Sequence, residues 1–164
     1  MTSEVKKYMG FFKSKKGSII SDYFKLTEDV AKFKAGNMYE VSLYEDYLEI
    51  TGMGKLSVKL KYEQITDVYY GLEKEIVEKS KSVIGRAVTG GLLLGGVGAV
   101  VGAVSGTGKK EKTVKKFMFI ISYKSSNGAD AFITFEDTRL YKGVKVAKKL
   151  KELCKVNDDT AEYL

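Results

Sequence analysis

Hydrophobic and polar residues alternate with a period of two over much of the chain, which is typical of half-buried strands. The alternation predicts six short strands, over residues 38–43, 47–50, 56–60, 62–70, 116–123 and 131–135. The first two are separated only by Glu45-Asp46, and the last two by a turn that contains Asn127-Gly128, a strong hairpin signal. Strands joined by short turns indicate an antiparallel meander.

Three other segments have helical features. Thr27 to Phe33 predicts a short helix that Thr27 caps and Gly36 follows, and residues 73–82 are compatible with another. A longer helix is expected to begin after Asp137 or Thr138 and to end near Val156. Its predicted buried stripe is Leu140, Val144, Ala147, Leu150 and Cys154, and its remaining surface is rich in lysine.

The segment from Val83 to Gly108 differs from the rest of the chain. After Arg86 it carries no charge for 22 residues, and its glycines lie among Leu, Val and Ala. Small residues recur at every fourth position, a spacing that lets helix backbones approach closely. The segment resembles the glycine-zipper segments of bacterial membrane-associated proteins. The expected membrane or oligomer contacts are Gly91, Leu92, Leu93, Leu94, Gly95, Gly98, Gly102 and Gly106.

The strands and the last helix together resemble the pleckstrin-homology-like (PH-like) fold in its small bacterial form. The phrases VSLYEDYLEITG and LKYEQITDVYYG carry the resemblance, which covers residues 37–70 and 114–156. It implies an α+β fold: an antiparallel split barrel capped by a C-terminal amphipathic helix, serving as a binding module. Lipid-binding members carry basic residues in the first hairpin loop. Because Glu45-Asp46 occupies the loop identified here, classical phosphoinositide binding is not expected.

Strands on both sides place residues 83–108 as an insertion in one barrel. A single transmembrane span would put its ends on opposite sides of a bilayer, which one barrel does not permit. A helical hairpin that turns near Gly95-Gly96 returns both ends to one side. Its flanks are positive, as expected beside an anionic cytoplasmic leaflet. The cations expected to contact that surface are Lys79, Lys81, Arg86, Lys109, Lys110, Lys112, Lys115 and Lys116.

Composition limits the chemistry. The net charge of +7 favours an anionic partner: a membrane surface, nucleic acid or an acidic protein. The chain has no histidine and one cysteine, which excludes His-based catalysis, His-ligated zinc and an internal disulfide. The segment GAVSGTGKK departs from the Walker A pattern because Lys110 stands where Ser or Thr is needed. We therefore expect no enzyme activity, cofactor or metal.

The sequence thus predicts an N-terminal extension over residues 1–36, a PH-like domain over 37–156 that is interrupted by 83–108, and a tail over 157–164. The N-terminus has no secretory signal, so we expect a cytoplasmic protein, peripheral at the inner face of the membrane. The insertion is expected to bind the membrane, to mediate homo-oligomerisation, or both. One alternative is a soluble adaptor for a protein partner, whose hairpin packs on itself or on a second copy. A basic nucleic-acid-binding domain is less favoured.

Overall fold

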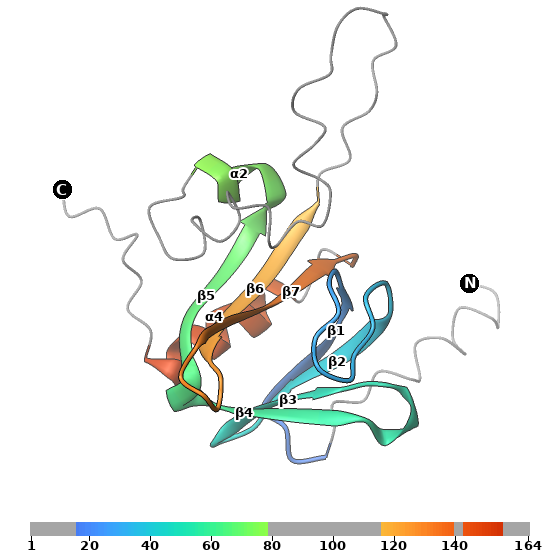
Figure 1. Cartoon of the computed structure of the whole chain (residues 1–164), viewed down its shortest axis with the longest axis vertical. Helices are drawn as coiled ribbons and strands as arrows, with labels where there is room; N and C mark the ends of the chain where they lie inside the picture. The colour runs from blue at the N-terminus through green and yellow to red at the C-terminus, as the bar shows by residue number, and fades with distance from the viewer. Residues whose placement is uncertain (1–15, 79–115, 140–142, 156–164) are drawn as a thin grey trace, which may run out of the picture.

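Seven antiparallel strands form one sheet in the computed structural model, which describes residues 16–78, 116–139 and 143–155 (Figure 1). Their order across the sheet is β4-β3-β2-β1-β7-β6-β5. The strands are β1 (Ile20–Leu26), β2 (Met38–Leu43), β3 (Tyr47–Thr51), β4 (Ser57–Lys61), β5 (Ile65–Leu72), β6 (Phe117–Lys124) and β7 (Asp130–Asp137). Short 3₁₀ turns follow β3 (η1, Met53–Lys55) and β4 (η2, Tyr62–Gln64), and the helices are α2 (Glu73–Glu78) and α4 (Gly143–Cys154). This is the split barrel with a C-terminal helix that the sequence predicts.

The inward-facing residues of the strands form the main core. Phe24, Phe119 and Phe135 come from three neighbouring strands, and each is fully buried. The ring centroid of Phe24 lies 4.9 Å from that of Phe119 and 5.9 Å from that of Phe135. Close aromatic pairs of this kind add to the stability that apolar burial supplies. The alternation that predicts β2 to β7 is therefore the alternation between this core and the outer face.

The central strand β1 was not predicted. It pairs with β2 over six residue pairs but reaches β7 only through Lys25↔Glu136 and Leu26↔Phe135, which is where the barrel splits. Asp22 occupies an inward position of this strand and is 5% exposed, whereas Phe24 and Leu26 are fully buried. A carboxylate at a core position interrupts the alternation of apolar and polar residues, so the sequence pattern does not predict this strand. The sheet thus begins at Ile20, before the boundary expected at residue 37.

The short helix expected over residues 27–33 is wrong. Val30 and Phe33 instead form an isolated antiparallel bridge, with Ala31 at a positive φ of 52°. Phe33 is buried against Tyr39, with ring centroids 4.6 Å apart, and Asp29 accepts a 2.8 Å hydrogen bond from the backbone N–H of Ala35. A helix this short is marginal in water by itself, so the burial of Phe33 decides the local conformation.

Thr138 and Arg139 are not helical, and the structure describes helix α4 from Gly143 to Cys154. It packs against β5, β1 and η2 and thereby fills the open side of the barrel (Figure 1). Ala147 and Leu150 are buried as predicted, but Val146 completes the stripe, and Val144 is 56% exposed. Cys154 packs against the edge of the core, and burial raises the pKa of its thiol to about 12. The remaining predicted stripe residue, Leu140, lies outside the described residues.

Gly143, the first residue of α4 that the structure describes, lies in a tight contact. A Cβ atom there would overlap with Asp137 Oδ2 and would lie 2.7 Å from Tyr70 Cε2. In an open helical position, Gly→Ala stabilises by about 1 kcal/mol. At Gly143 the added methyl group would overlap with its neighbours, so the substitution should destabilise the protein instead. We expect Gly143→Ala to lower the free energy of unfolding by about 1–3 kcal/mol. Urea unfolding followed by circular dichroism measures the change.

Val144→Ala is the matched control, because that side chain is exposed on the same turn. We expect it to change stability by less than about 0.5 kcal/mol. A Gly143→Ala variant as stable as the wild type would show that helix α4 tolerates a side chain at its first residue.

Candidate functional site

The connection between β5 and β6 leaves the sheet and returns to it at the same end of these two strands. Strands β5 and β6 remain in antiparallel register up to the pair Leu72↔Phe117. Beyond that pair, the backbone N–H of Glu73 donates a 3.0 Å hydrogen bond to the carbonyl oxygen of Lys116. The chain between Glu73 and Lys116, which contains α2 and residues 79–115, therefore starts and ends at two hydrogen-bonded neighbours. We call this place the insertion root, defined by Leu72, Glu73, Lys116 and Phe117.

A second, smaller apolar cluster supports the insertion root. Helix α2 folds back so that Ile76, at 2% exposure, packs with Met118 and Ile120 on the face of the sheet opposite the main core. Tyr69 and Phe132 pack at the edge of this cluster. Figure 1 shows α2 at the end of the molecule where β5 ends and β6 begins. Apolar burial therefore holds the first residues after β5 on the barrel.

Tyr69 and Gly71 form a close contact beside this cluster. A Cβ atom at Gly71 would lie 2.6 Å from the Tyr69 hydroxyl oxygen, so the glycine provides the space for that ring. The Tyr69 hydroxyl donates a 3.3 Å hydrogen bond to the carbonyl oxygen of Leu72 at the root. Burial, together with the negative charge of Glu75, raises the pKa of Tyr69 to about 12. The tyrosine is therefore a neutral donor at physiological pH.

A buried polar cluster lies next to the root, where α4 begins. The Tyr70 hydroxyl donates a 2.7 Å hydrogen bond to Asp137 Oδ2, and Asp137 Oδ1 accepts a 3.0 Å bond from the backbone N–H of Arg139. Arg139 also lies 3.7 Å from Asp22 Oδ1. Desolvation and the hydrogen bond to Asp137 raise the pKa of Tyr70. These contacts tie β5, β7 and the approach to α4 together, which is a structural role.

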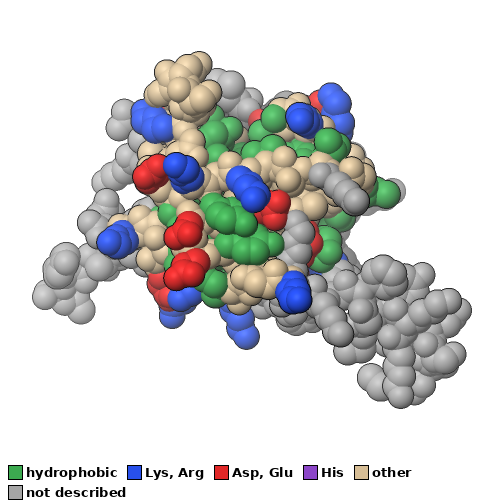
Figure 2. All heavy atoms as spheres, turned by 90° about the horizontal axis from the view of Figure 1, so that it is seen from below, with side chains coloured by type: hydrophobic (Ala, Val, Ile, Leu, Met, Phe, Trp, Pro, Cys, Tyr) green, Lys and Arg blue, Asp and Glu red, His purple; other side chains and the backbone are tan. Residues whose placement is uncertain are grey.

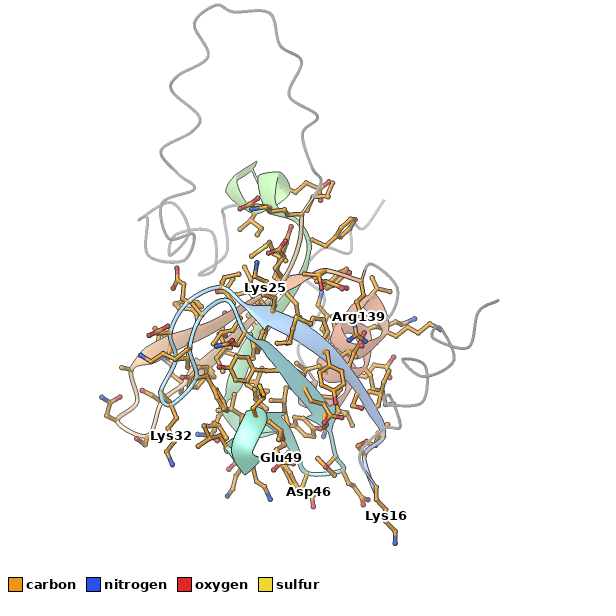
Figure 3. All side chains as sticks on the ribbon, turned by 90° about the vertical axis from the view of Figure 1, so that its right-hand side faces the viewer. Lys16, Lys25, Lys32, Asp46, Glu49 and Arg139 are labelled. Carbon is orange, nitrogen blue, oxygen red and sulfur yellow. The ribbon has the colours of Figure 1, made fainter. Side chains whose placement is uncertain are left out.

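The loop between β1 and β2 is the first hairpin loop of the sheet, so the loop at Glu45-Asp46 is the second. The expectation that Glu45-Asp46 forms the first hairpin loop was therefore wrong. The first loop contains the basic residues Lys32 and Lys34, so its charge does not argue against phosphoinositide binding. Lys34 Nζ lies 2.6 Å from Asp29 Oδ2. The backbone N–H of Ala35 and then the Lys34 ammonium group lower the pKa of Asp29, and the Asp29 carboxylate in turn raises the pKa of Lys34. In Figure 3, Lys32 lies on the opposite side of the barrel from Arg139.

Nearly all predicted contact residues lie outside the described part of the chain. The glycines and leucines from Gly91 to Gly106 fall in the segment 79–115, as do the flanking cations other than Lys116. Lys116 is exposed and belongs to the insertion root. Sequence reasoning missed the supporting residues Ile76, Tyr70 and Gly143. Of these, only Ile76 left a signal, as an apolar residue within a polar segment that favours a helix.

A family model described as "glycine zipper containing PH domain" matches residues 3–137. The chain belongs to this family. The match includes all seven strands and the insertion, and it ends at Asp137, before α4. Both the PH-like fold and the glycine zipper inferred from the sequence are thereby confirmed. No curated protein matches the chain.

Within the described ranges, no helix is long and apolar enough to cross a membrane. The same ranges hold no group of three or more His, Cys, Asp or Glu residues that is arranged to bind a metal ion. PH-like domains are in general binding modules without catalytic activity.

The hydrogen bond between Tyr70 and Asp137 provides a test of the cluster beside the root. We expect Tyr70→Phe to lower the free energy of unfolding at pH 7 by about 1–3 kcal/mol, because the buried Asp137 carboxylate loses a donor. The pKa of Tyr70 is raised in the folded protein, so just above pH 10 the Tyr70 hydroxyl ionises in the unfolded chain but not in the folded one. The free energy of unfolding of the wild type should therefore fall above pH 10. The difference in this free energy between the wild type and Tyr70→Phe should become smaller.

Urea unfolding at pH 7, 9 and 11 measures both effects. Tyr123→Phe is the control: burial also raises the pKa of Tyr123, and the described residues offer its hydroxyl no hydrogen bond. We expect it to cost less than Tyr70→Phe at pH 7. Equal costs for the two variants would contradict a specific role for the bond to Asp137.

Proposed function

We propose that this glycine zipper PH domain is a non-enzymatic binding module that associates with an anionic membrane surface through its insertion, and that the insertion also mediates self-association. The observation that carries the proposal is the insertion root. The backbone bond from Glu73 to Lys116 and the pair Leu72↔Phe117 bring both ends of the segment together. Any apolar structure that this segment inserts into lipid must therefore leave by the side on which it entered.

The length and charge of the segment agree with a shallow insertion. Two helical arms of about ten residues would each rise about 15 Å, roughly half the thickness of the hydrocarbon core. Cations flank the uncharged stretch on both sides, so both flanks suit the same anionic leaflet. We expect peripheral binding at the cytoplasmic face, where anionic lipids concentrate.

Self-association would use the glycines of the same segment. Glycine costs a soluble helix about 1 kcal/mol relative to alanine, so repeated glycines in a helix require a close packing partner. The small-residue spacing of Gly91, Gly95, Gly98, Gly102 and Gly106 provides smooth faces for one. If that partner is only the second arm of the hairpin or a second copy, the protein is a soluble adaptor. A measurement of lipid binding distinguishes the membrane-binding module from the soluble adaptor, because only the former binds vesicles.

Deletion of residues 83–108 with a short polar linker tests the proposal. We expect the barrel to stay folded, because the residues that pair at the insertion root lie outside the deleted range and surface loops tolerate changes in length. Co-sedimentation with vesicles containing phosphatidylserine should be lost. Replacing Lys109, Lys110, Lys112, Lys115 and Lys116 by Gln should weaken binding strongly at low salt, since each cation contributes about 1 kcal/mol. If the deletion variant is folded and binds vesicles as strongly as the wild type, the proposal of membrane association through the insertion is refuted.

Gly98 and Gly102 test the packing role separately. They share a helix face, because residues four apart are neighbours. We expect Gly98→Leu and Gly102→Leu to reduce cross-linked oligomers or vesicle retention, because the larger side chain separates the helices and forfeits dispersion contacts. Val97→Leu is the control, since it adds a methylene group without filling a glycine position. If both glycine variants match the wild type in cross-linking and flotation, the zipper contact is wrong.

A further inference from the structure

Charge is divided unequally between the barrel and helix α4. The described residues before Gly143 include eleven Lys and Arg against fifteen Asp and Glu, a net charge of −4. Residues 143–155 carry five lysines and one glutamate, a net charge of +4. Several barrel lysines are also paired, as in Lys25–Glu136 and Lys124–Asp130. Figure 2 shows one face on which basic and acidic side chains are interspersed.

The start of α4 lies beside the insertion root. A Cβ atom at Gly143 would lie 2.7 Å from the Tyr70 ring, and Tyr70 is two residues before Leu72. The Tyr70 ring also stacks on that of Phe117, with centroids 5.9 Å apart. From this point α4 runs back along β5 and reaches η2, which precedes that strand. The first turns of α4 are therefore near the root, and its last turn is far from it.

Three exposed side chains occupy these first turns. Val144 is 56% exposed, and Lys145 and Lys148 are exposed beside it. A valine beside two lysines suits the boundary of a lipid headgroup layer, where aliphatic stems and a small apolar side chain meet phosphates. Single-stranded nucleic acid is a poorer fit, because α4 contains no aromatic residue on which bases could stack.

We propose that Val144, Lys145 and Lys148 form a second lipid-facing patch that continues the anionic-membrane contact from the insertion root onto α4. This inference rests on the membrane association proposed above and identifies a further surface for it. Stable attachment to a membrane commonly requires two signals, one apolar and one electrostatic. The insertion supplies the apolar signal, and the start of α4 adds a fixed electrostatic one.

Paired lysine variants of the full chain test this patch. Lys145→Gln/Lys148→Gln removes two charges near the root, and Lys151→Gln/Lys155→Gln removes two charges from the far end of the same helix. A lysine near an anionic surface is worth about fivefold in affinity. On phosphatidylserine-containing vesicles at low salt, we expect the first variant to bind about thirtyfold more weakly and the second less than about threefold more weakly. Lys and Gln have similar helix propensities, so unfolding midpoints should match the wild type.

Equal losses in the two double variants would show that only net charge matters and would overturn the patch. Wild-type vesicle affinity in the Lys145→Gln/Lys148→Gln variant would also overturn the patch. This holds even if deletion of residues 83–108 abolishes vesicle binding, in which case the proposed function stands. Conversely, if the deletion variant binds as the wild type does and only the α4 variant loses affinity, the insertion-based function fails and the patch remains. Loss of binding to an oligothymidine probe, with vesicle binding retained, would also overturn it.

Discussion

The pairing of β5 with β6 is the constraint on which the rest of the structure depends. It keeps register from Val68↔Ile121 to Leu72↔Phe117 and brings together two chain segments that 44 intervening positions separate in the sequence. One side of this pair presents Phe119 and Ile121 to the main core, and the other presents Met118 and Ile120 to α2. The insertion therefore begins and ends on a ladder that is buried on both faces, and changes within it need not disturb the barrel.

Helix α4 depends on the same ladder. Its first residue lies against Tyr70 on β5 and Asp137 at the end of β7, in a space that only glycine fits. This contact and the burial of Val146 and Leu150 in the main core position the helix and leave Val144 in solvent. Long-range packing thus decides which face of the lysine-rich helix is available to a partner, and where that face lies relative to the insertion root.

Hydrogen bonds hold the chain in place beside the root. Tyr69 and Tyr70 are held neutral by burial, and their hydroxyl groups donate to the Leu72 carbonyl oxygen and to Asp137. A guanidinium nitrogen of Arg139 lies 3.7 Å from Asp22 Oδ1, and its guanidinium carbon lies 5.3 Å from the centroid of the Tyr23 ring. These contacts give the root a fixed shape, as expected of a module that presents a segment to a surface.

The sequence by itself determined six of the seven strands, because their residues alternate between a buried and a solvated face. It also determined the glycine zipper, whose spacing and lack of charge need no tertiary context. Only the tertiary structure revealed β1, since the inward Asp22 hides its period, and only tertiary burial of Phe33 replaced the expected helix with a bridge. The rotation of α4 was equally inaccessible, because it depends on a contact between Gly143 and residues 6 and 73 positions earlier in the chain. Local pattern thus indicated which strand residues are buried, whereas long-range contacts decided where the sheet begins and which face of α4 is buried.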